Sequence, residues 1–396
     1  MEKEANSFGF QFQSGIYAQR VRYKYPQFFE GERQMRGKSI SIAAVLFVVL
    51  TFLLITPADA EILYNIKGLG TFGGNDNIGL GINNSGQVVG TSYSPAWRAF
   101  LWSNGVTTDL GLGSGEGINN SGQATGLAYT DSGNGYAFLW SNGAMTDVGT
   151  LSGGGSYGWG INDSGQVTGW SVTSSGTAHA FLWNNGVGGR RPYTKDLGTL
   201  GGDFSAGYAI NNIGQVTGSS SRASGDIPIM DHAFLWSNGV MTDLGTLGGS
   251  ESFGRGINDS GQVVGTSMTA SGAVHAFLWS NGVMTDLGTL DGYEGPGSRA
   301  FGINESGQVV GWSSKSGGGT HGFLWSNGVM TDLNTLIDPS SGWVLHGAHG
   351  INDVGQIIGY GTYNGVSQPL ILTPTPEPAT LLLLGLGGLA LRKRKK

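Results

Sequence analysis

The stretch Gly256-Ile257-Asn258-Asp259-Ser260-Gly261-Gln262 decides the fold, because related stretches recur along the chain. The other copies begin at Gly81, Gly117, Gly160, Ala209, Gly302 and Gly350. The seven copies stand 36 to 49 residues apart. A repeat of this length is typical of architectures in which each copy is one small structural unit that packs against the next.

Two more motifs complete the repeat. Ala276-Phe277-Leu278-Trp279-Ser280-Asn281-Gly282 has relatives that begin at Ala99, Ala137, Ala180, Ala233 and Gly322. The segment 284–290, Met-Thr-Asp-Leu-Gly-Thr-Leu, follows it and also recurs. Asn281-Gly282 is a strong hairpin signal, since both residue types accept the positive φ of a type I′ turn. We therefore expect four short strands per unit: one ending in Gly-Ile-Asn, then 262–267, 275–279 and 284–287.

The third strand of each unit is apolar on both faces, so its sheet must be covered on both sides. Units of 40 to 50 residues with four strands are typical of β-propellers. The segment 66–74 resembles a fourth strand and its exit but precedes the first unit, whereas the last unit ends after 369–372 without a fourth strand. The sequence predicts an all-β fold over 61–372, a propeller of seven four-stranded blades closed by the N-terminal strand.

Three units contain His-Ala-Phe, at 179–181, 232–234 and 275–277. These tripeptides, with Gly-Ile-Asn and Ser-Gly-Gln, are similar to the HAF extracellular repeat family over about 66–372. Arg98 and Tyr136 stand where the first two units would have His, and the last unit has lost Phe-Leu-Trp. The resemblance implies a secreted repeat protein with no established activity.

The N-terminal 60 residues have the layout of a secretory signal. A short basic stretch at 35–38 precedes an apolar run at 40–55 and then Ala58 and Ala60. The run is shorter than the roughly 20 residues that span a bilayer, and small residues favour cleavage. We predict a signal peptide at 35–60, with a retained anchor as the alternative, and interpret 1–34 as an extension from a start codon assigned too early.

The C-terminal residues 373–396 form a second signal. Pro376-Glu377-Pro378 precedes an apolar segment at 381–391 and the basic end 392–396. This order resembles the PEP-CTERM sorting signal, which implies removal of the tail by exosortase in a Gram-negative bacterium that makes extracellular polysaccharide. The apolar segment would contact the membrane only transiently. An ordinary tail anchor is the alternative.

Composition excludes several functions. Residues 61–373 contain 9 Lys and Arg against 21 Asp and Glu, a net charge of −12, which argues against nucleic acid because phosphate binding needs clustered cations. The chain has 73 glycines, no cysteine and 12% charged residues, a composition poor in helix formers and rich in turns. Residues 113–117 and 153–155 are glycine runs without the following helix of a dinucleotide site, and we interpret them as loops.

No catalytic, metal or cofactor site is predicted from the repeated polar residues. A catalytic base is needed once, so His179, His232, His275 and His321 at one repeat position are expected to make local hydrogen bonds. The aspartate of the fourth strand should brace a turn or a backbone amide of a neighbouring blade. Asn-Asp-Ser-Gly is interpreted as a turn, with calcium as the alternative, because it lacks the length and late glutamate of a calcium loop.

Function should lie where the repeats differ. The residue before Gly-Ile-Asn, expected at the start of the innermost strand, varies most. It is Leu80, Glu116, Trp159, Tyr208, Arg255, Phe301 or His349. These side chains are expected to surround one mouth of the central channel, where aromatic and polar groups suit sugar recognition. Packing between blades is the alternative.

The sequence thus predicts a non-catalytic binding or scaffolding module of the envelope or extracellular matrix, associated with exopolysaccharide. One alternative is an enzyme that hydrolyses or eliminates glycosides, with carboxylates in the channel; the candidates are Glu116, Asp203, Glu251 and Glu294. Another is a purely structural surface protein.

Overall fold

The computed structural model describes residues 64–70, 76–93, 95–130, 132–186, 191–223, 230–293 and 295–376. The predicted signal peptide, the extension before it, and Glu377, Pro378 and the rest of the sorting tail lie outside these ranges. The described residues belong to one compact unit, 61–396.

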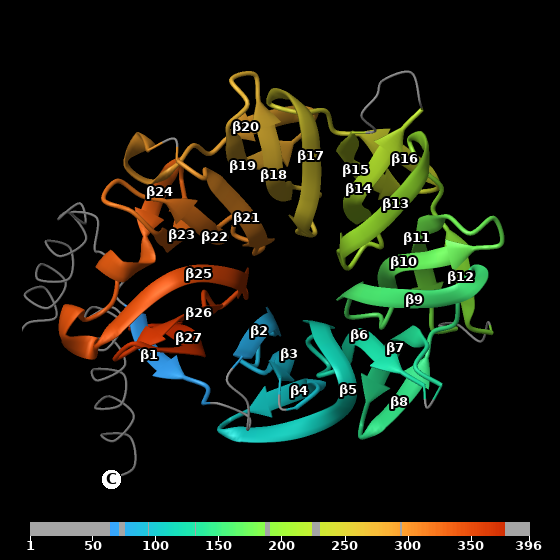
Figure 1. Ribbon diagram of the computed structural model, residues 1–396, viewed down its shortest axis with the longest axis horizontal. Helices are drawn as coiled ribbons and strands as arrows, with labels where there is room; N and C mark the ends of the chain where they lie inside the picture. The colour runs from blue at the N-terminus through green and yellow to red at the C-terminus, as the bar shows by residue number, and fades with distance from the viewer. Residues whose placement is uncertain are drawn as a thin grey trace, which may run out of the picture. The chain divides into compact units, whose positions relative to one another are not determined.

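The described chain is all-β, with only three short 3₁₀ helices. Each sheet is antiparallel and lies beside the next around a common axis (Figure 1). Four sheets follow chain order, with the bounds β9 (Ser152–Ile161), β10 (Val167–Thr173), β11 (Ala178–Asn184) and β12 (Tyr193–Asp196); β13 (Gly201–Ile210), β14 (Val216–Arg222), β15 (Asp231–Ser237) and β16 (Val240–Asp243); β17 (Gly248–Ile257), β18 (Val263–Thr269), β19 (Val274–Ser280) and β20 (Val283–Asp286); β21 (Ser298–Ile303), β22 (Val309–Ser314), β23 (Thr320–Ser326) and β24 (Val329–Asp332).

The first sheet has seven strands because one strand serves two units. β5 pairs with β4 up to Leu112 and with β6 from Gly113, so this sheet consists of two four-stranded halves joined without a loop. Its strands are β2 (Asp76–Ile82), β3 (Val88–Tyr93), β4 (Trp97–Ser103), β5 (Val106–Ile118), β6 (Ala124–Tyr129), β7 (Gly135–Ser141) and β8 (Ala144–Asp147).

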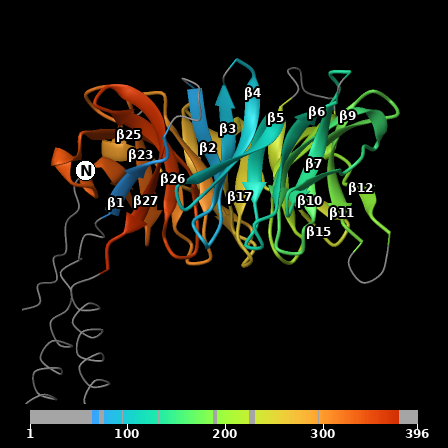
Figure 2. The same ribbon diagram turned by 90° about the horizontal axis from the view of Figure 1, so that it is seen from below.

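The two ends of the described chain share one sheet. β1 pairs with β27, Ile66 opposite Leu372, so the order is β1-β27-β26-β25 (Figure 2). The segment that resembles a fourth strand therefore occupies the fourth-strand place beside the last unit. The remaining elements are β1 (Tyr64–Gly68), β25 (Trp343–Ile351), β26 (Ile357–Tyr363), β27 (Val366–Pro374), η1 (Leu290–Gly292), η2 (Leu333–Thr335) and η3 (Pro339–Ser341).

The core lies between sheets, as the two-sided apolar third strand predicts. Ala276 of β19 packs with Ile303, Val309 and Phe323 of the following sheet, and both Ala276 and Phe323 are fully buried. The hairpin prediction is also confirmed where φ is positive at both turn residues, as at Asn281 (51°) and Gly282 (86°).

The interpretation of the two glycine runs as loops is wrong. Residues 113–117 lie in β5 and 153–155 lie in β9. A Cβ on Gly113 would stand 1.8 Å from the backbone oxygen of Leu127, and one on Gly153 would stand 2.3 Å from that of Val172. Glycine is used here because backbones approach closely, which a search for side-chain alternation does not detect.

Candidate functional site

The variable residue before Gly-Ile-Asn is the extra residue of a β-bulge in every unit. Gly254 and Gly256 of β17 pair with the consecutive residues Gly265 and Val264 of β18, which leaves Arg255 unpaired. A Cβ on Gly265 would stand 1.8 Å from the backbone oxygen of Phe253, so the strand opposite needs glycine. The same register shift leaves one residue unpaired in every other unit. We call these seven the bulge residues: Leu80, Glu116, Trp159, Tyr208, Arg255, Phe301 and His349.

A bulge turns a side chain out of the regular alternation of its strand. All seven bulge residues are half-buried. They lie near the end of the innermost strand, and not at its start as predicted, because that strand extends back through the glycine runs; Trp159 is the eighth residue of the ten in β9.

Four side chains from three consecutive sheets form an aromatic arc. The ring of Trp159 lies 4.9 Å from that of Tyr157 and 4.8 Å from that of Tyr208 in the next sheet. The guanidinium of Arg255, one sheet further, lies 4.3 Å from the Tyr208 ring centre. Cation–π contact of this kind is favourable when partly desolvated. Neighbouring bulge residues therefore touch across sheet boundaries.

Phe301 and His349 form a second contact between bulge residues, with ring centres 5.5 Å apart. His349 Nδ1 lies 3.1 Å from the backbone oxygen of Gly79, across the junction of the last and first units. Burial lowers the pKa of His349, only partly opposed by the bond to Gly79. The neutral imidazole is therefore favoured, with Nδ1 as the donor to this carbonyl.

Glu116 is the one acidic bulge residue. Tyr157 donates its hydroxyl hydrogen to Glu116, and Ser114 Oγ lies 2.7 Å from the Tyr157 hydroxyl. Burial raises the pKa of Glu116, although the hydrogen bonds from Tyr157 and Ser114 lower it. The carboxyl is held as a hydrogen-bond acceptor in a poorly solvated place.

We expect Glu116→Gln to change how stability depends on pH. The folded pKa lies above the ordinary value of 4.5, so the folded protein binds more protons than the unfolded chain between the two values. Wild-type stability should therefore fall as pH rises through this window, and the variant should lack that loss. Urea unfolding of both proteins at pH 4 and pH 8 measures this change. If the unfolding free energies of the two proteins differ by the same amount at both pH values, Glu116 carries no such penalty.

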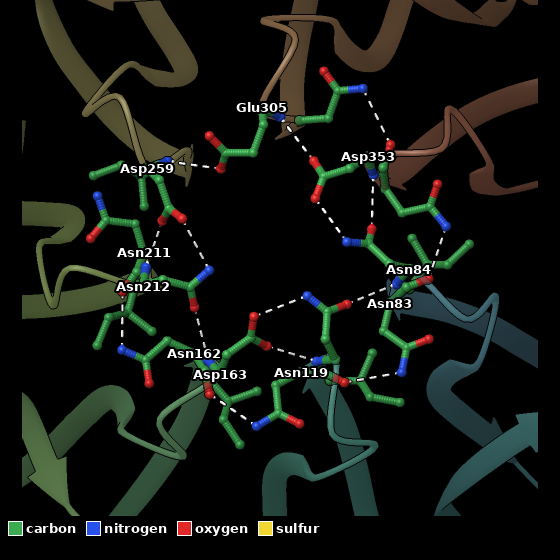
Figure 3. Close-up of a pocket in the computed structure, with 18 of the residues that line it drawn as sticks. Asn83, Asn84, Asn119, Asn162, Asp163, Asn211, Asn212, Asp259, Glu305 and Asp353 are labelled. Carbon is green, nitrogen blue, oxygen red and sulfur yellow. Dashed lines mark hydrogen bonds between the residues drawn. The ribbon is translucent and has the colours of Figure 1, made fainter.

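One mouth of the central channel is lined by the turns that contain the asparagine of Gly-Ile-Asn. Figure 3 shows it surrounded by the turns that follow Gly-Ile-Asn, around a cavity of 160 Å³. In each unit, the side-chain amide of the asparagine in Gly-Ile-Asn donates to the backbone oxygen of the equivalent asparagine in the next unit, at 2.8 to 3.2 Å. The last of these bonds runs from Asn352 to Asn83. These turn asparagines are Asn83, Asn119, Asn162, Asn211, Asn258, Asn304 and Asn352.

A second set of hydrogen bonds encircles the same mouth. The backbone amide after each turn asparagine donates to the side chain of the equivalent residue in the next unit, at 2.7 to 3.0 Å, and the last bond returns from Asp353 to Asn84. The acceptors are Asn120, Asp163, Asn212, Asp259, Glu305, Asp353 and Asn84. Burial, with the charges of Asp259 and Asp353, raises the pKa of Glu305. Within the described ranges, no group of three or more His, Cys, Asp or Glu is arranged to hold a metal ion.

The repeated histidines make the local hydrogen bonds expected of them. His275 Nδ1 lies 2.8 Å from Asp286 in the adjacent fourth strand, and Asp286 accepts from the amide of Gly288 at 2.7 Å. The same pairing joins His179, His232 and His321 to their aspartates. In the first unit Arg98 takes the place of His and contacts Asp109 at 2.6 Å. The aspartate thus braces its own turn instead of a neighbouring blade.

The remaining acids are separately placed. Asp203 is exposed on β13, and Glu294 lies outside the described residues. Glu251 of β17 stands near Asp231 of β15; burial and then the Glu251 charge raise the Asp231 pKa. Asp231 was not among the predicted candidates, because no motif links two strands of different sheets.

Within the part of the chain described, no helix is long and apolar enough to cross a membrane. Residues 374–396 match the PEP-CTERM protein-sorting motif. This motif identifies an exported protein that exosortase recognises and processes, with transfer across the inner membrane to the cell surface. Pro376 is the one residue of the Pro-Glu-Pro motif within the described ranges.

A comparison with curated proteins finds no match. Among solved structures, the chain is similar to the β-propeller domain of the Trilobed protease from Pyrococcus furiosus, with a TM-score of 0.49, 8% identity, and coverage of 78% of this chain and 95% of that one. TolB from Acinetobacter baumannii gives 0.41 at 11% identity, covering 73% and 63%. The Aleuria aurantia lectin in complex with Fucα1-6GlcNAc gives 0.34 at 13% identity, covering 66% and 96%.

Proposed function

We propose that residues 61–372 form a closed ring of seven four-stranded blades. Counting the two halves of the sheet β2–β8 separately supports seven. Closure is supported by β1, which completes the sheet of β25–β27, and by both sets of turn hydrogen bonds, which return from the last unit to the first through Asn352 and Asp353.

On this ring we propose a non-catalytic binding or scaffolding function at the cell surface or in the extracellular matrix, in association with exopolysaccharide. The observation that carries the proposal is the set of seven bulges, because each repeat presents its most variable residue at the same irregularity. A rigid scaffold with variable positions is a common basis for recognition. The similarity of the repeats to the HAF family agrees with an extracellular role.

The proposed ligand-binding residues are Glu116, Trp159, Tyr208, Arg255, Phe301 and His349. Aromatic rings with one apolar face and nearby polar groups suit a sugar, whose own faces are apolar and whose edges carry hydroxyls. A glycan array probed with the purified exported protein, with and without calcium, tests the proposal. Binding to at least one extracellular glycan is expected; binding to none would favour a purely structural surface protein.

Trp159→Ala should weaken glycan binding by about 1 to 3 kcal/mol, the range for a base stacked on an aromatic side chain. Stability should change little if the exposed part of the ring faces the ligand. If Trp159 serves only to fill space between Tyr157 and Tyr208, the same change should cost about 3 to 5 kcal/mol of unfolding free energy. Titrations and thermal melts of this variant and of Arg255→Ala separate the two; large losses of stability in both would contradict a ligand site here.

The second candidate function is a glycoside-cleaving enzyme, favoured by the proximity of Asp231 and Glu251. Two carboxyl groups on either side of the scissile bond are what glycoside hydrolysis requires. Incubation of the exported protein with its host's polysaccharide, followed by an assay for new reducing or unsaturated ends, tests it. Cleavage that is lost in Asp231→Asn would replace the non-catalytic proposal.

A further inference from the structure

A separate pocket of 310 Å³ opens between the two halves of the sheet β2–β8. This volume is at the lower end of the roughly 300 to 1,000 Å³ usual for small-ligand sites. Only Leu80 among the bulge residues lines it. Its lining residues are Ile78, Leu80, Thr91, Trp97, Gly113, Ser114, Leu127, Tyr129 and Tyr157.

The pocket lies at the shortest repeat. Gly81 and Gly117 are 36 residues apart, and β5 runs straight from one half of the sheet to the other. In later repeats, a loop between sheets places a leucine amide against a serine of the second strand, as Leu200 does with Ser220 at 2.8 Å and Leu247 with Ser267 at 2.9 Å. The equivalent residue of β6 is the buried Ala128, which has no hydroxyl to receive such a bond. β5 takes the place of that loop, and Tyr129, the residue of β6 after Ala128, is exposed.

The pocket contains an unsatisfied polar group. Thr91 is 7% exposed, and its Oγ1 is buried with no hydrogen-bond partner among the described residues. A buried hydroxyl without a partner costs roughly 1 to 3 kcal/mol, so a rotation of the Thr91 side chain that brings the hydroxyl to the pocket surface would let a bound group recover this amount relative to an apolar one. Ser114 and Tyr157, whose hydroxyls are 2.7 Å apart, supply further polar groups in the same lining.

The aromatic residues of the pocket are specific to this place in the chain. Trp97 and Tyr129 are each 46% exposed, and the Tyr93 ring lies tilted beside that of Trp97 with ring centres 5.1 Å apart. At the position of Trp97, the later sheets have Ala178, Asp231, Val274 and Thr320; at that of Tyr129 they have Val172, Ser221, Met268 and Ser314. None of these four sheets has an aromatic ring at either position.

We propose that this pocket binds one neutral hexose unit of an extracellular glycan. Among its described lining residues none is charged, which disfavours an acidic sugar or a phosphate. Exposed rings suit the apolar face of a hexose, and the three hydroxyl groups suit its hydroxyl edge. The inference rests on the proposed glycan-binding role; its site shares Tyr157 with the aromatic arc but does not include Trp159 or Tyr208.

Methyl glycosides of glucose, galactose and mannose are the probes, titrated into the exported protein by calorimetry and saturation-transfer NMR. Thr91→Val deletes the unpaired hydroxyl and keeps the shape, so affinity for the bound hexoside should fall about tenfold while the unfolding midpoint does not fall. Trp97→Ala should reduce affinity at least tenfold. Thr266→Val is the matched control, at the same repeat position in β18, and should leave affinity unchanged.

Three outcomes overturn the inference. Equal hexoside affinity in the wild-type protein and in Thr91→Val, Trp97→Ala and Thr266→Val would place the sugar elsewhere. A loss of affinity confined to Trp159→Ala would then preserve the proposed function without this pocket. Methyl glucuronide bound as tightly as the neutral hexosides would contradict the specificity. If no hexoside binds while the host polysaccharide does, the pocket is not a hexose site; if neither binds, the proposed function fails as well.

Discussion

Asn258→Ala should lower the free energy of unfolding by about 3 kcal/mol, because the change leaves one buried and two part-buried groups unpaired at about 1 to 3 kcal/mol each. The Asn258 amide group donates to Gln262 Oε1 at 2.8 Å and to the backbone oxygen of Asn304 at 3.2 Å, and its oxygen accepts from the Gln262 amide at 3.0 Å. Asn258 is 2% exposed, so water cannot easily replace these bonds. Urea unfolding measures the loss.

Asp259→Ala is the matched control in the same turn. Asp259 accepts from the Asn212 backbone and side-chain amides, but at an exposed site where water substitutes. We expect a change within about 0.5 kcal/mol, as for other surface substitutions. Equal effects of the two substitutions would mean that the buried asparagines do not hold neighbouring units together.

Removal of β1 should destabilise the protein by about 4 kcal/mol and cause self-association. Tyr64 is 4% exposed and, with Ile66, packs on the core of the last sheet; burying such a side chain is worth about 1.5 to 3 kcal/mol. Without β1, the edge of β27 has unpaired backbone groups that can pair with another chain. A protein that begins at Asp76 should melt earlier and elute as oligomers in size-exclusion chromatography with light scattering.

A protein that begins at Glu61 is the control, because it keeps β1 while lacking the predicted signal peptide. It should remain monomeric and melt like the exported protein. If the two truncated proteins have the same melting temperature and both stay monomeric, β1 does not complete the last sheet in solution.

Local patterns in the sequence predicted the local structure well. Asn281-Gly282 adopts the positive φ angles of its turn, the third strands are buried on both faces, and 66–68 lies where a fourth strand is missing. Each of these features depends on neighbouring residues or on comparison of one repeat with another.

Features that depend on the register of paired strands or on contacts between units were missed. The bulges arise from a register shift between two strands, and the only signal was the glycine opposite each one, such as Gly265. The turn asparagines recur in all seven units, but their donation to the next unit requires the ring to be assembled. The pocket beside Thr91 had a faint signal, the spacing of 36 residues, whose consequence depends on how β5 joins the two halves of its sheet.

The most direct test of the central claim, a closed seven-bladed ring whose bulge residues bind an extracellular glycan, is a crystal structure of the exported protein with an oligosaccharide from its host's polysaccharide. Seven blades with β1 beside β27, and a sugar in contact with Trp159 or Tyr208, are the predicted result. An open or differently numbered ring, or a bound oligosaccharide that touches none of the bulge residues, would contradict the claim.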